Sequence, residues 1–199
     1  MKLNNINLSQ MQFNFTKTLR GVGAIKGEYG QEEVRIYHLD EPQDQSDLLK
    51  ARKSQAWRGN FYLEDTATFA KDYIKKYSVY SMENTDGDLL CYCVVDNNRS
   101  KESKLRLIET APQLSCYNKI QRRAKYIGET MMAFIAAQSK NKDFTIAEVA
   151  DRPQTKDFYY KGCKFVPHKN CGAILSNSNL GKLISKNATH TGKKIEIIG

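Results

Sequence analysis

Apolar and polar positions alternate in several short stretches of this sequence, a pattern typical of half-buried strands. Residues 34–39 alternate in this way, and two further apolar stretches, 77–82 and 89–95, flank the segment Asn-Thr-Asp-Gly-Asp at 84–88. Because Asp-Gly between apolar stretches is a strong turn signal, this pair is predicted to form a hairpin. Residues 105–110 are predicted to be the next strand, which Pro112 ends.

Apolar residues at helical spacing predict helices in four other places, separated by further strands. The helices are expected over 45–55, over 65–74, over the apolar residues that follow Gly128, and from 151 to about 160. Strands are expected over 144–149, 165–166 and 173–175, with a last extended stretch at 194–198. The predicted order is a strand, two helices, three consecutive strands, and then helix, strand, helix and strand. This order predicts an α+β fold with a mixed sheet.

The N-terminal residues form a segment of different character. Apolar side chains alternate with polar ones at Met11, Phe13 and Phe15, and glycines follow at 21, 23, 27 and 30. We expect an extended or hairpin-like arm over 1–33 and a single domain over 34–199. Gly21-x-Gly23 is predicted to be a turn, since no helical pattern follows it. An exposed arm of this kind could also pair between the protomers of a homodimer.

Composition narrows the class of protein. No stretch of the 199 residues approaches the roughly 18 apolar residues of a membrane span, and residues 1–7 lack the apolar core of a signal peptide. We therefore expect no membrane partner and a cytoplasmic location. The sequence has five cysteines, and none of them form a Cys-x-x-Cys pair or lie near a pair of histidines. Buried free thiols are therefore expected rather than disulfides or a metal site. The net charge of +9 suits an acidic partner such as a nucleotide or RNA, although a merely lysine-rich composition gives the same value.

The candidate chemistry begins at Arg122-Arg123-Ala124-Lys125-Tyr126-Ile127-Gly128-Glu129-Thr130, which precedes the apolar run 131–137. A basic, glycine-containing turn that opens a helix is suited to bind an anion, because free N–H groups and the helix dipole converge there. The strand before it ends about ten residues upstream. This arrangement suits a ligand that carries a pyrophosphate at one end and a reactive group lying along the strand.

Two motifs and the order of elements resemble the GNAT superfamily of N-acetyltransferases. The family's pyrophosphate turn has the pattern Arg/Gln-x-x-Gly-x-Gly/Ala, here with Arg123 first, Tyr126 in the place of the first glycine and Gly128 last. The family's Phe-Tyr-x-x-x-Gly-Phe pattern is matched by residues 159–165, with Lys164 in the glycine position and Phe165 closing it. The resemblance covers about residues 34–175. It implies a mixed, mostly antiparallel central sheet flanked by helices, preceded by an N-terminal extension.

The resemblance also implies acetyl-CoA as co-substrate and assigns residues to it. The pyrophosphate would bind N–H groups of the turn, at Arg123, Ala124, Lys125, Tyr126, Ile127, Gly128, Glu129 and Thr130. The pantetheine would lie along the backbone of Ile108–Thr110. A tyrosine that needs positive φ at 126 would cost roughly 1–2 kcal/mol, so this turn either follows another path or binds the ligand less tightly.

Two side chains are candidates for proton transfer. Glu109 could take a proton from the incoming amine, provided that burial raises its pKa; it could equally face solvent or bind a loop backbone. Tyr160 is the candidate general acid that protonates the leaving thiolate, with Tyr159 as the alternative if the motif is shifted by one residue. The same aromatic residues could also be core side chains only. Cys163 has no base motif beside it and is expected to be structural.

Two classes of function follow. The first is direct transfer of an acetyl group from acetyl-CoA to a primary amine, which could belong to a small molecule, a protein or an aminoacyl-tRNA. The second is a GNAT-like protein without turnover that binds nucleic acid or another protein, since Tyr126 and Lys164 replace two glycines of the pattern.

Overall fold

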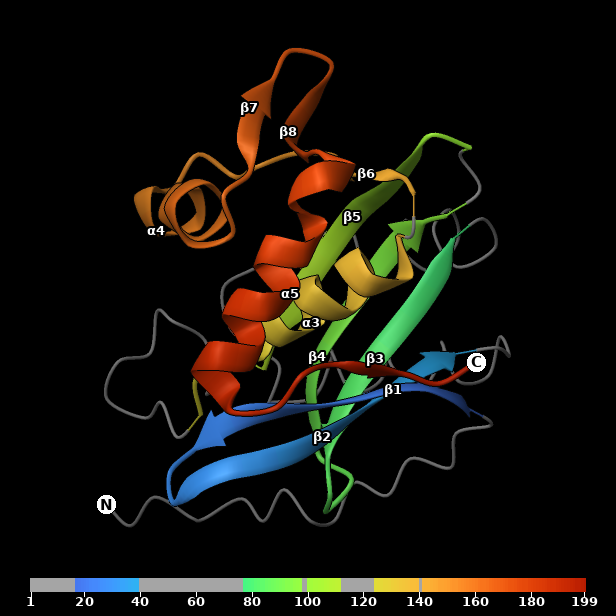
Figure 1. Cartoon of the computed structure of the whole chain (residues 1–199), viewed down its shortest axis with the longest axis vertical. Helices are drawn as coiled ribbons and strands as arrows, with labels where there is room; N and C mark the ends of the chain where they lie inside the picture. Colours follow the sequence, from blue (N-terminus) through green and yellow to red (C-terminus); the bar gives the residue numbers. More distant parts are fainter. Residues whose placement is uncertain (1–16, 40–76, 98–99, 112–123, 140) are drawn as a thin grey trace, which may run out of the picture.

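A computed structural model describes residues 17–39, 77–97, 100–111, 124–139 and 141–199. In these residues nine strands form one sheet in the order β7-β8-β6-β5-β4-β3-β2-β1-β9 (Figure 1). β5 and β6 are parallel, and the other described pairs are antiparallel. The predicted α+β fold with a mixed, mostly antiparallel sheet is therefore confirmed. The two helices expected over 45–55 and 65–74 lie outside the described residues.

The first hairpin consists of β1 (Lys17–Gly27) and β2 (Gly30–Leu39). Where the sequence predicts an arm over 1–33, the structure has β1 hydrogen-bonded between β2 and β9. The predicted turn at Gly21-x-Gly23 is wrong, because both glycines lie inside β1. A Cβ on Gly21 would come within 2.9 Å of the Phe134 ring, and one on Gly23 within 2.5 Å of Ile195. These glycines let a helix and the C-terminal segment approach the strand closely.

The central hairpin consists of β3 (Ser78–Asn84) and β4 (Leu89–Asp96), as predicted. Its turn is held by the Asn84 side chain, whose Oδ1 accepts bonds from the N–H groups of Asp86 at 3.1 Å and Asp88 at 2.8 Å. Gly87 has φ of 86°. The strand that follows, β5, covers Glu102–Thr110.

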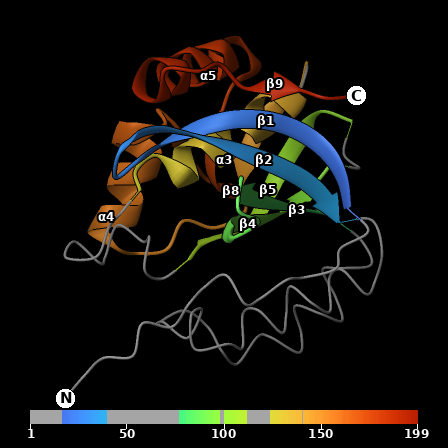
Figure 2. The ribbon, with the colours of Figure 1, turned by 90° about the horizontal axis from the view of Figure 1, so that it is seen from below.

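Helices α3 (Ile127–Gln138) and α5 (Asn177–Thr191) pack against each other. Figure 2 shows α5 on the outside and β1 and β2 arching across the molecule beside it. Residues on every side of α3 are buried, because the helix contacts the sheet as well as α5. The helix after Gly128 is thus confirmed, whereas α5 is not among the elements predicted from the sequence.

The C-terminal half supplies the remaining elements. β6 is limited to Asp143–Ile146, shorter than the predicted strand, and β9 to Glu196–Ile197. The helix expected from 151 to about 160 is a short α4 (Pro153–Lys156) that continues as a wider π-helical segment, η6 (Asp157–Gly162). β7 (Val166–His168) and β8 (Cys171–Leu175) form a hairpin at the edge of the sheet.

Candidate functional site

β5 and β6 lie side by side only at the start of β5. Residues 102–105 pair in parallel with residues 143–146, and a bond of 2.8 Å from the Ala147 N–H to the Leu105 carbonyl follows. Beyond this point no described residue pairs with β5 on its β6 side. The peptide groups of Ile108–Thr110 therefore lie on the part of β5 that β6 leaves uncovered (Figure 1).

An extra residue in β5 marks the point of divergence. Leu105 pairs with Val95 and Leu107 with Val94, so Arg106 stands opposite no residue of β4. A bulge of this kind bends a strand and increases its twist. The sequence prediction of a strand over 105–110 does not include this bulge. Bulge and divergence together leave the end of β5 without a described partner strand on one side, next to the helix α3, which contacts both β4 and β5.

The turn before α3 provides a group of backbone N–H donors. Tyr126 is the N-cap of α3, with φ of 68° and ψ of 12°. The Lys125 N–H donates to the Lys26 carbonyl at 2.8 Å, and the Thr130 N–H to the Tyr126 carbonyl at 2.8 Å. The N–H groups of residues 126–129 have no such backbone acceptor among the described residues, as expected for a helix start. A left-handed residue followed by helical ones directs successive N–H groups to one point, which forms a small anion-binding nest.

These bonds reduce the number of backbone N–H donors that were expected from the sequence over 123–130. Lys125 and Thr130 use their N–H groups within the protein, so Tyr126, Ile127, Gly128 and Glu129 are the candidate donors. Ala124 is buried beside them. Arg123, the first residue of the motif, lies outside the described residues. A pyrophosphate is one anion that could accept from four N–H groups, because it offers several acceptor oxygens.

The aromatic segment η6 contacts this turn. A Cβ on Gly128 would lie 3.4 Å from Cζ of Phe158, which places the Phe158 ring against the start of α3. Tyr159 is buried in the core, where its ring centre lies 5.1 Å from that of Phe158 and 6.0 Å from that of Phe165. Tyr160 is half-buried, and its hydroxyl donates a long bond of 3.4 Å to the Gly172 carbonyl. The structure thus brings the two sequence motifs together through Gly128 and Phe158.

The backbone at both replaced glycines is left-handed. Tyr126 has φ of 68° and Lys164 has φ of 64°. Glycine is the residue that adopts this conformation without steric cost. The two positions at which the family pattern has glycine are therefore positions at which this backbone favours it. This agreement supports the alignment with Tyr160 as the motif tyrosine and Lys164 in the glycine position.

Glu109 lies on the face of the sheet opposite α3. It is paired across the strands with Tyr92, whose hydroxyl donates to its Oε2 at 2.5 Å. Tyr92 is buried and Glu109 is half-buried. Ile108, the preceding residue, points to the other face and packs on the core cluster that includes Ile127 at the start of α3. No described contact joins Glu109 to Tyr160.

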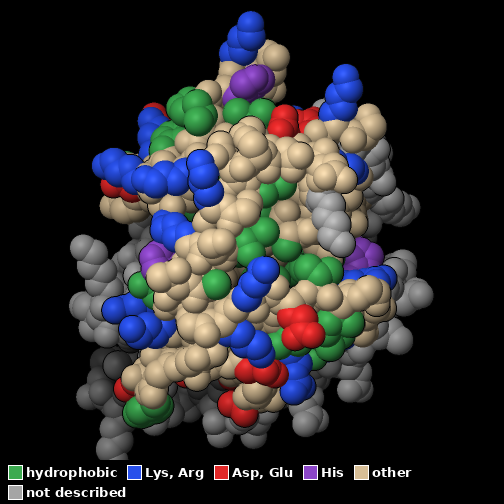
Figure 3. All heavy atoms as spheres, viewed as in Figure 1, with side chains coloured by type: hydrophobic (Ala, Val, Ile, Leu, Met, Phe, Trp, Pro, Cys, Tyr) green, Lys and Arg blue, Asp and Glu red, His purple; other side chains and the backbone are tan. Residues whose placement is uncertain are grey.

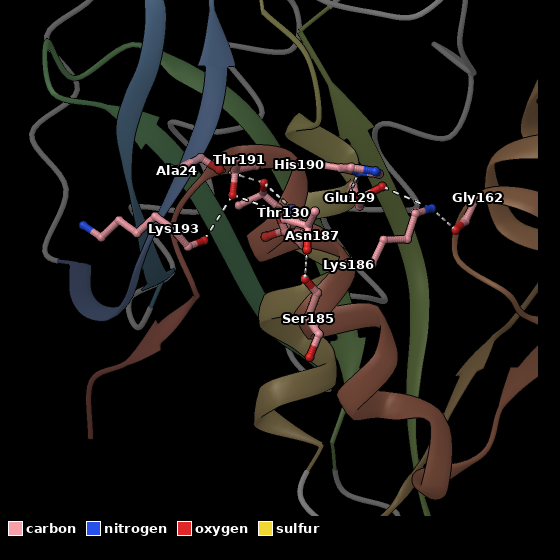
Figure 4. A network of polar contacts seen from close by, with 11 residues as sticks. Ala24, Glu129, Thr130, Gly162, Ser185, Lys186, Asn187, His190, Thr191 and Lys193 are labelled. Atoms are coloured by element: carbon pink, nitrogen blue, oxygen red, sulfur yellow. Dashed lines mark hydrogen bonds and ion pairs between the residues drawn. The ribbon is translucent and has the colours of Figure 1, made fainter.

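A polar network connects α3 to α5 (Figure 4). The buried Glu129 carboxylate lies 2.8 Å from Nδ1 of His190 and 3.6 Å from Nζ of Lys186, which also donates to the Gly162 carbonyl at the end of η6. The His190 ring stacks on Tyr126, with ring centres 4.7 Å apart and an interplanar angle of 26°. The elements predicted from the sequence do not include α5, so the sequence could not place His190 beside Glu129 and Tyr126. The Glu129 side chain is thus turned toward α5.

The cysteines have the expected structural character. Burial raises the pKa of Cys163 to about 12 and holds the pKa values of Cys91 and Cys93 well above the ordinary range. These three and the half-buried Cys171 are free thiols; Cys116 lies outside the described residues. Nowhere in the described part of the chain do three or more metal-ligating side chains cluster.

Positive charge is dispersed over the face that carries α5. Figure 3 shows Lys and Arg side chains scattered among acidic, apolar and neutral ones on this face, without a continuous basic stripe. Of the helices that the structure describes, none has the length and apolarity to cross a membrane.

Comparisons with known proteins agree with this geometry. No protein-family model and no curated protein matches the sequence. Among solved structures, a chimera of spermidine N-acetyltransferase SpeG from Vibrio cholerae with hSSAT is similar, with a TM-score of 0.53 and 12% identity over 74% of this chain and 97% of that one. A mutant of the Vibrio cholerae enzyme gives a TM-score of 0.51 and 11% identity over 74% of this chain and 95% of that one. The chain therefore has the GNAT fold of the N-acetyltransferases, formed by a sequence that shares few residues with theirs.

Proposed function

We propose that this chain is an acetyl-CoA-dependent N-acetyltransferase that transfers an acetyl group directly to a primary amine. One observation carries the proposal: the part of β5 that pairs with no described strand on its β6 side and the N–H groups at the start of α3 belong to elements that contact each other. The strand edge suits the amides of a pantetheine, and the N–H groups suit a pyrophosphate. A protein that only binds a partner through its surface has no need of this combination.

The replacement of glycine by Tyr126 is compatible with ligand binding. The Tyr126 ring is directed to His190 on α5, so the side chain has a place outside the group of N–H donors. The backbone retains the left-handed conformation that aims these donors. This arrangement favours the enzyme over a GNAT-like protein whose cofactor cleft is filled by a side chain.

Two side chains are proposed to move protons. Glu109 would accept a proton from the amine, directly or through water, while the Tyr92 hydroxyl fixes its position. Tyr160 would donate a proton to the departing thiolate; a phenol has an ordinary pKa of about 10 and a thiol one of about 8.5. The 3.4 Å bond from Tyr160 to Gly172 is weak enough to be exchanged for a bond to the thiolate. Tyr159 is a poorer candidate because it is buried among aromatic rings.

Thermal melting with and without acetyl-CoA tests the proposal. At about 100 times its dissociation constant a ligand stabilises the folded state by roughly 2.7 kcal/mol. Tyr160→Phe is expected to lower kcat by about 100-fold or more and to keep the ligand-induced shift in Tm. Tyr159→Phe makes the same chemical change one residue away and should leave kcat nearly unchanged. The absence of any shift in Tm at millimolar acetyl-CoA would refute the proposal that this chain is an acetyl-CoA-dependent enzyme.

The acceptor remains open among a small amine, a protein amine and an aminoacyl-tRNA. The SpeG proteins are named as spermidine N-acetyltransferases, and a small polyamine is accordingly the first acceptor to assay. For RNA, the Lys and Arg side chains on the face in Figure 3 form no continuous stripe that would follow a phosphate backbone. If tRNA is the partner, the affinity for tRNA should fall steeply as the salt concentration rises. An affinity that does not change with salt, or no binding at all, would exclude tRNA as the acceptor.

A further inference from the structure

Tyr126 occupies a conformation that it would not keep alone. The left-handed conformation costs a residue with a Cβ roughly 1–2 kcal/mol of conformational free energy. Such a residue persists only where its surroundings fix it. The direction of the N–H groups at 126–129 depends on this one φ angle, so whatever fixes Tyr126 also shapes the proposed phosphate site.

Backbone bonds at Lys125 and Thr130 flank Tyr126, and the contact on its side chain comes from α5. His190 stacks on the tyrosine ring at 4.7 Å, and its Nδ1 is held at 2.8 Å by the buried carboxylate of Glu129. The ring of His190 is thus fixed by two residues of the same turn, one through its face and one through its edge. A freely rotating side chain would not give the stack this definite orientation.

Helix α5 is also hydrogen-bonded to the core beside the first turn of α3 (Figure 4). Asn187 donates from Nδ2 to the Thr130 hydroxyl at 3.0 Å, and that hydroxyl donates to the Ala24 carbonyl of β1 at 2.9 Å. Asn187 and Thr130 are fully buried. A second connection runs from Lys186 of α5 to the Gly162 carbonyl at the end of η6. One helix therefore contacts both motifs of the proposed ligand site.

We propose that His190 is a positioning residue: by stacking on Tyr126 it holds the turn before α3 in the conformation that binds the pyrophosphate of acetyl-CoA. This inference rests on the proposed function. The helix α5 thereby performs the task that a glycine would perform at position 126. When the binding-competent turn is populated only part of the time, the apparent affinity falls by that fraction.

Four variants separate this role from others. His190→Ala should raise the Kd and KM for acetyl-CoA about five- to tenfold, with kcat within about twofold of wild type. His190→Phe keeps an aromatic ring on Tyr126 and should retain most of the affinity. In a Tyr126→Gly background, His190→Ala should change Kd less than twofold, because glycine keeps positive φ without support. His168→Ala, on the β7–β8 hairpin, is the histidine control.

Calorimetric titration with acetyl-CoA is the readout, together with steady-state kinetics. If wild type binds and His190→Ala binds equally well, the positioning role is wrong while the enzyme stands. If His190→Ala costs the same affinity in the Tyr126→Gly background, His190 contacts the ligand itself and the inference is equally overturned. If wild type binds no acetyl-CoA at all, the proposed function fails first and the inference fails with it.

Discussion

Two turns of this molecule, at Tyr126 and at Lys164, hold a residue other than glycine at φ of 68° and 64°. Tyr126 is half-buried and stacks on His190, whereas the Lys164 side chain is exposed. The two turns therefore tolerate the same backbone conformation for different reasons. At position 126 a packed partner compensates the steric cost, and at position 164 the rest of the fold absorbs it. The Tyr126 side chain contacts α5 directly, whereas α5 reaches the turn at Lys164 only through Lys186, which donates to the Gly162 carbonyl.

The largest expected difference appears on truncation to alanine. Tyr126→Ala keeps the backbone strain and removes the stacked ring, so it should lower the free energy of unfolding by about 2 kcal/mol. Lys164→Ala keeps the same strain and removes only an exposed side chain, with an expected change within about 0.5 kcal/mol. Urea denaturation of both variants provides the measurement. Equal losses at the two positions would show that the stack on His190 contributes nothing.

A smaller difference in the free energy of unfolding is expected between the alanine and glycine variants. Alanine is usually the more stable of the two, and here the order should be reversed. At both positions the glycine variant should be more stable than the alanine variant by about 1 kcal/mol, since only glycine avoids the Cβ penalty. Gly181 is the matched control: it lies in α5, is exposed, and has open space around its Cβ position. Gly181→Ala should stabilise the protein by about 0.5–1 kcal/mol. A glycine less stable than alanine at 126 or 164 would contradict the left-handed backbone there.

The smallest expected effect concerns Cys163, next to Lys164. Burial raises the pKa of this thiol to about 12, so the reactive thiolate is scarce in the folded protein at pH 8. Iodoacetamide at pH 8, followed by peptide mapping, should label Cys171 well before Cys163. Rapid labelling of native Cys163 would mean that the Lys164 turn opens easily and that its strain is not absorbed by a rigid fold.

Much of the sheet could be predicted because its signals are local. Asn84 and Gly87 specify the central hairpin within five residues, and the apolar run after Gly128 specifies α3. Gly21 and Gly23 were misleading, since their purpose is the close approach of Phe134 and Ile195 from remote parts of the chain. Such tertiary contacts leave no local pattern.

The candidate site also has one part that local sequence signals predict and one part that they do not. The turn before α3 and the aromatic motif are contiguous segments, so both could be proposed as site segments from the sequence. The role of α5 could not, because its inner face includes the buried polar residues Asn187 and Thr191 beside Leu180 and Leu183, which weakens the amphipathic pattern. His190 acquires a partner only when α5 packs on α3. The positive φ at Tyr126, expected from the sequence only as a possible cost, occurs at a residue whose ring stacks on His190 of α5.

The central claim is that backbone N–H groups at the start of α3 bind the pyrophosphate of acetyl-CoA. Amide NMR of the ¹⁵N-labelled protein during titration with acetyl-CoA tests it most directly, with S-acetylpantetheine, which lacks the pyrophosphate, as the matched ligand. Acetyl-CoA is expected to cause large, saturable shifts of the amides of Ile127, Gly128 and Glu129, and the truncated ligand much smaller ones. Unchanged amides at these three residues, with or without binding elsewhere, would contradict it.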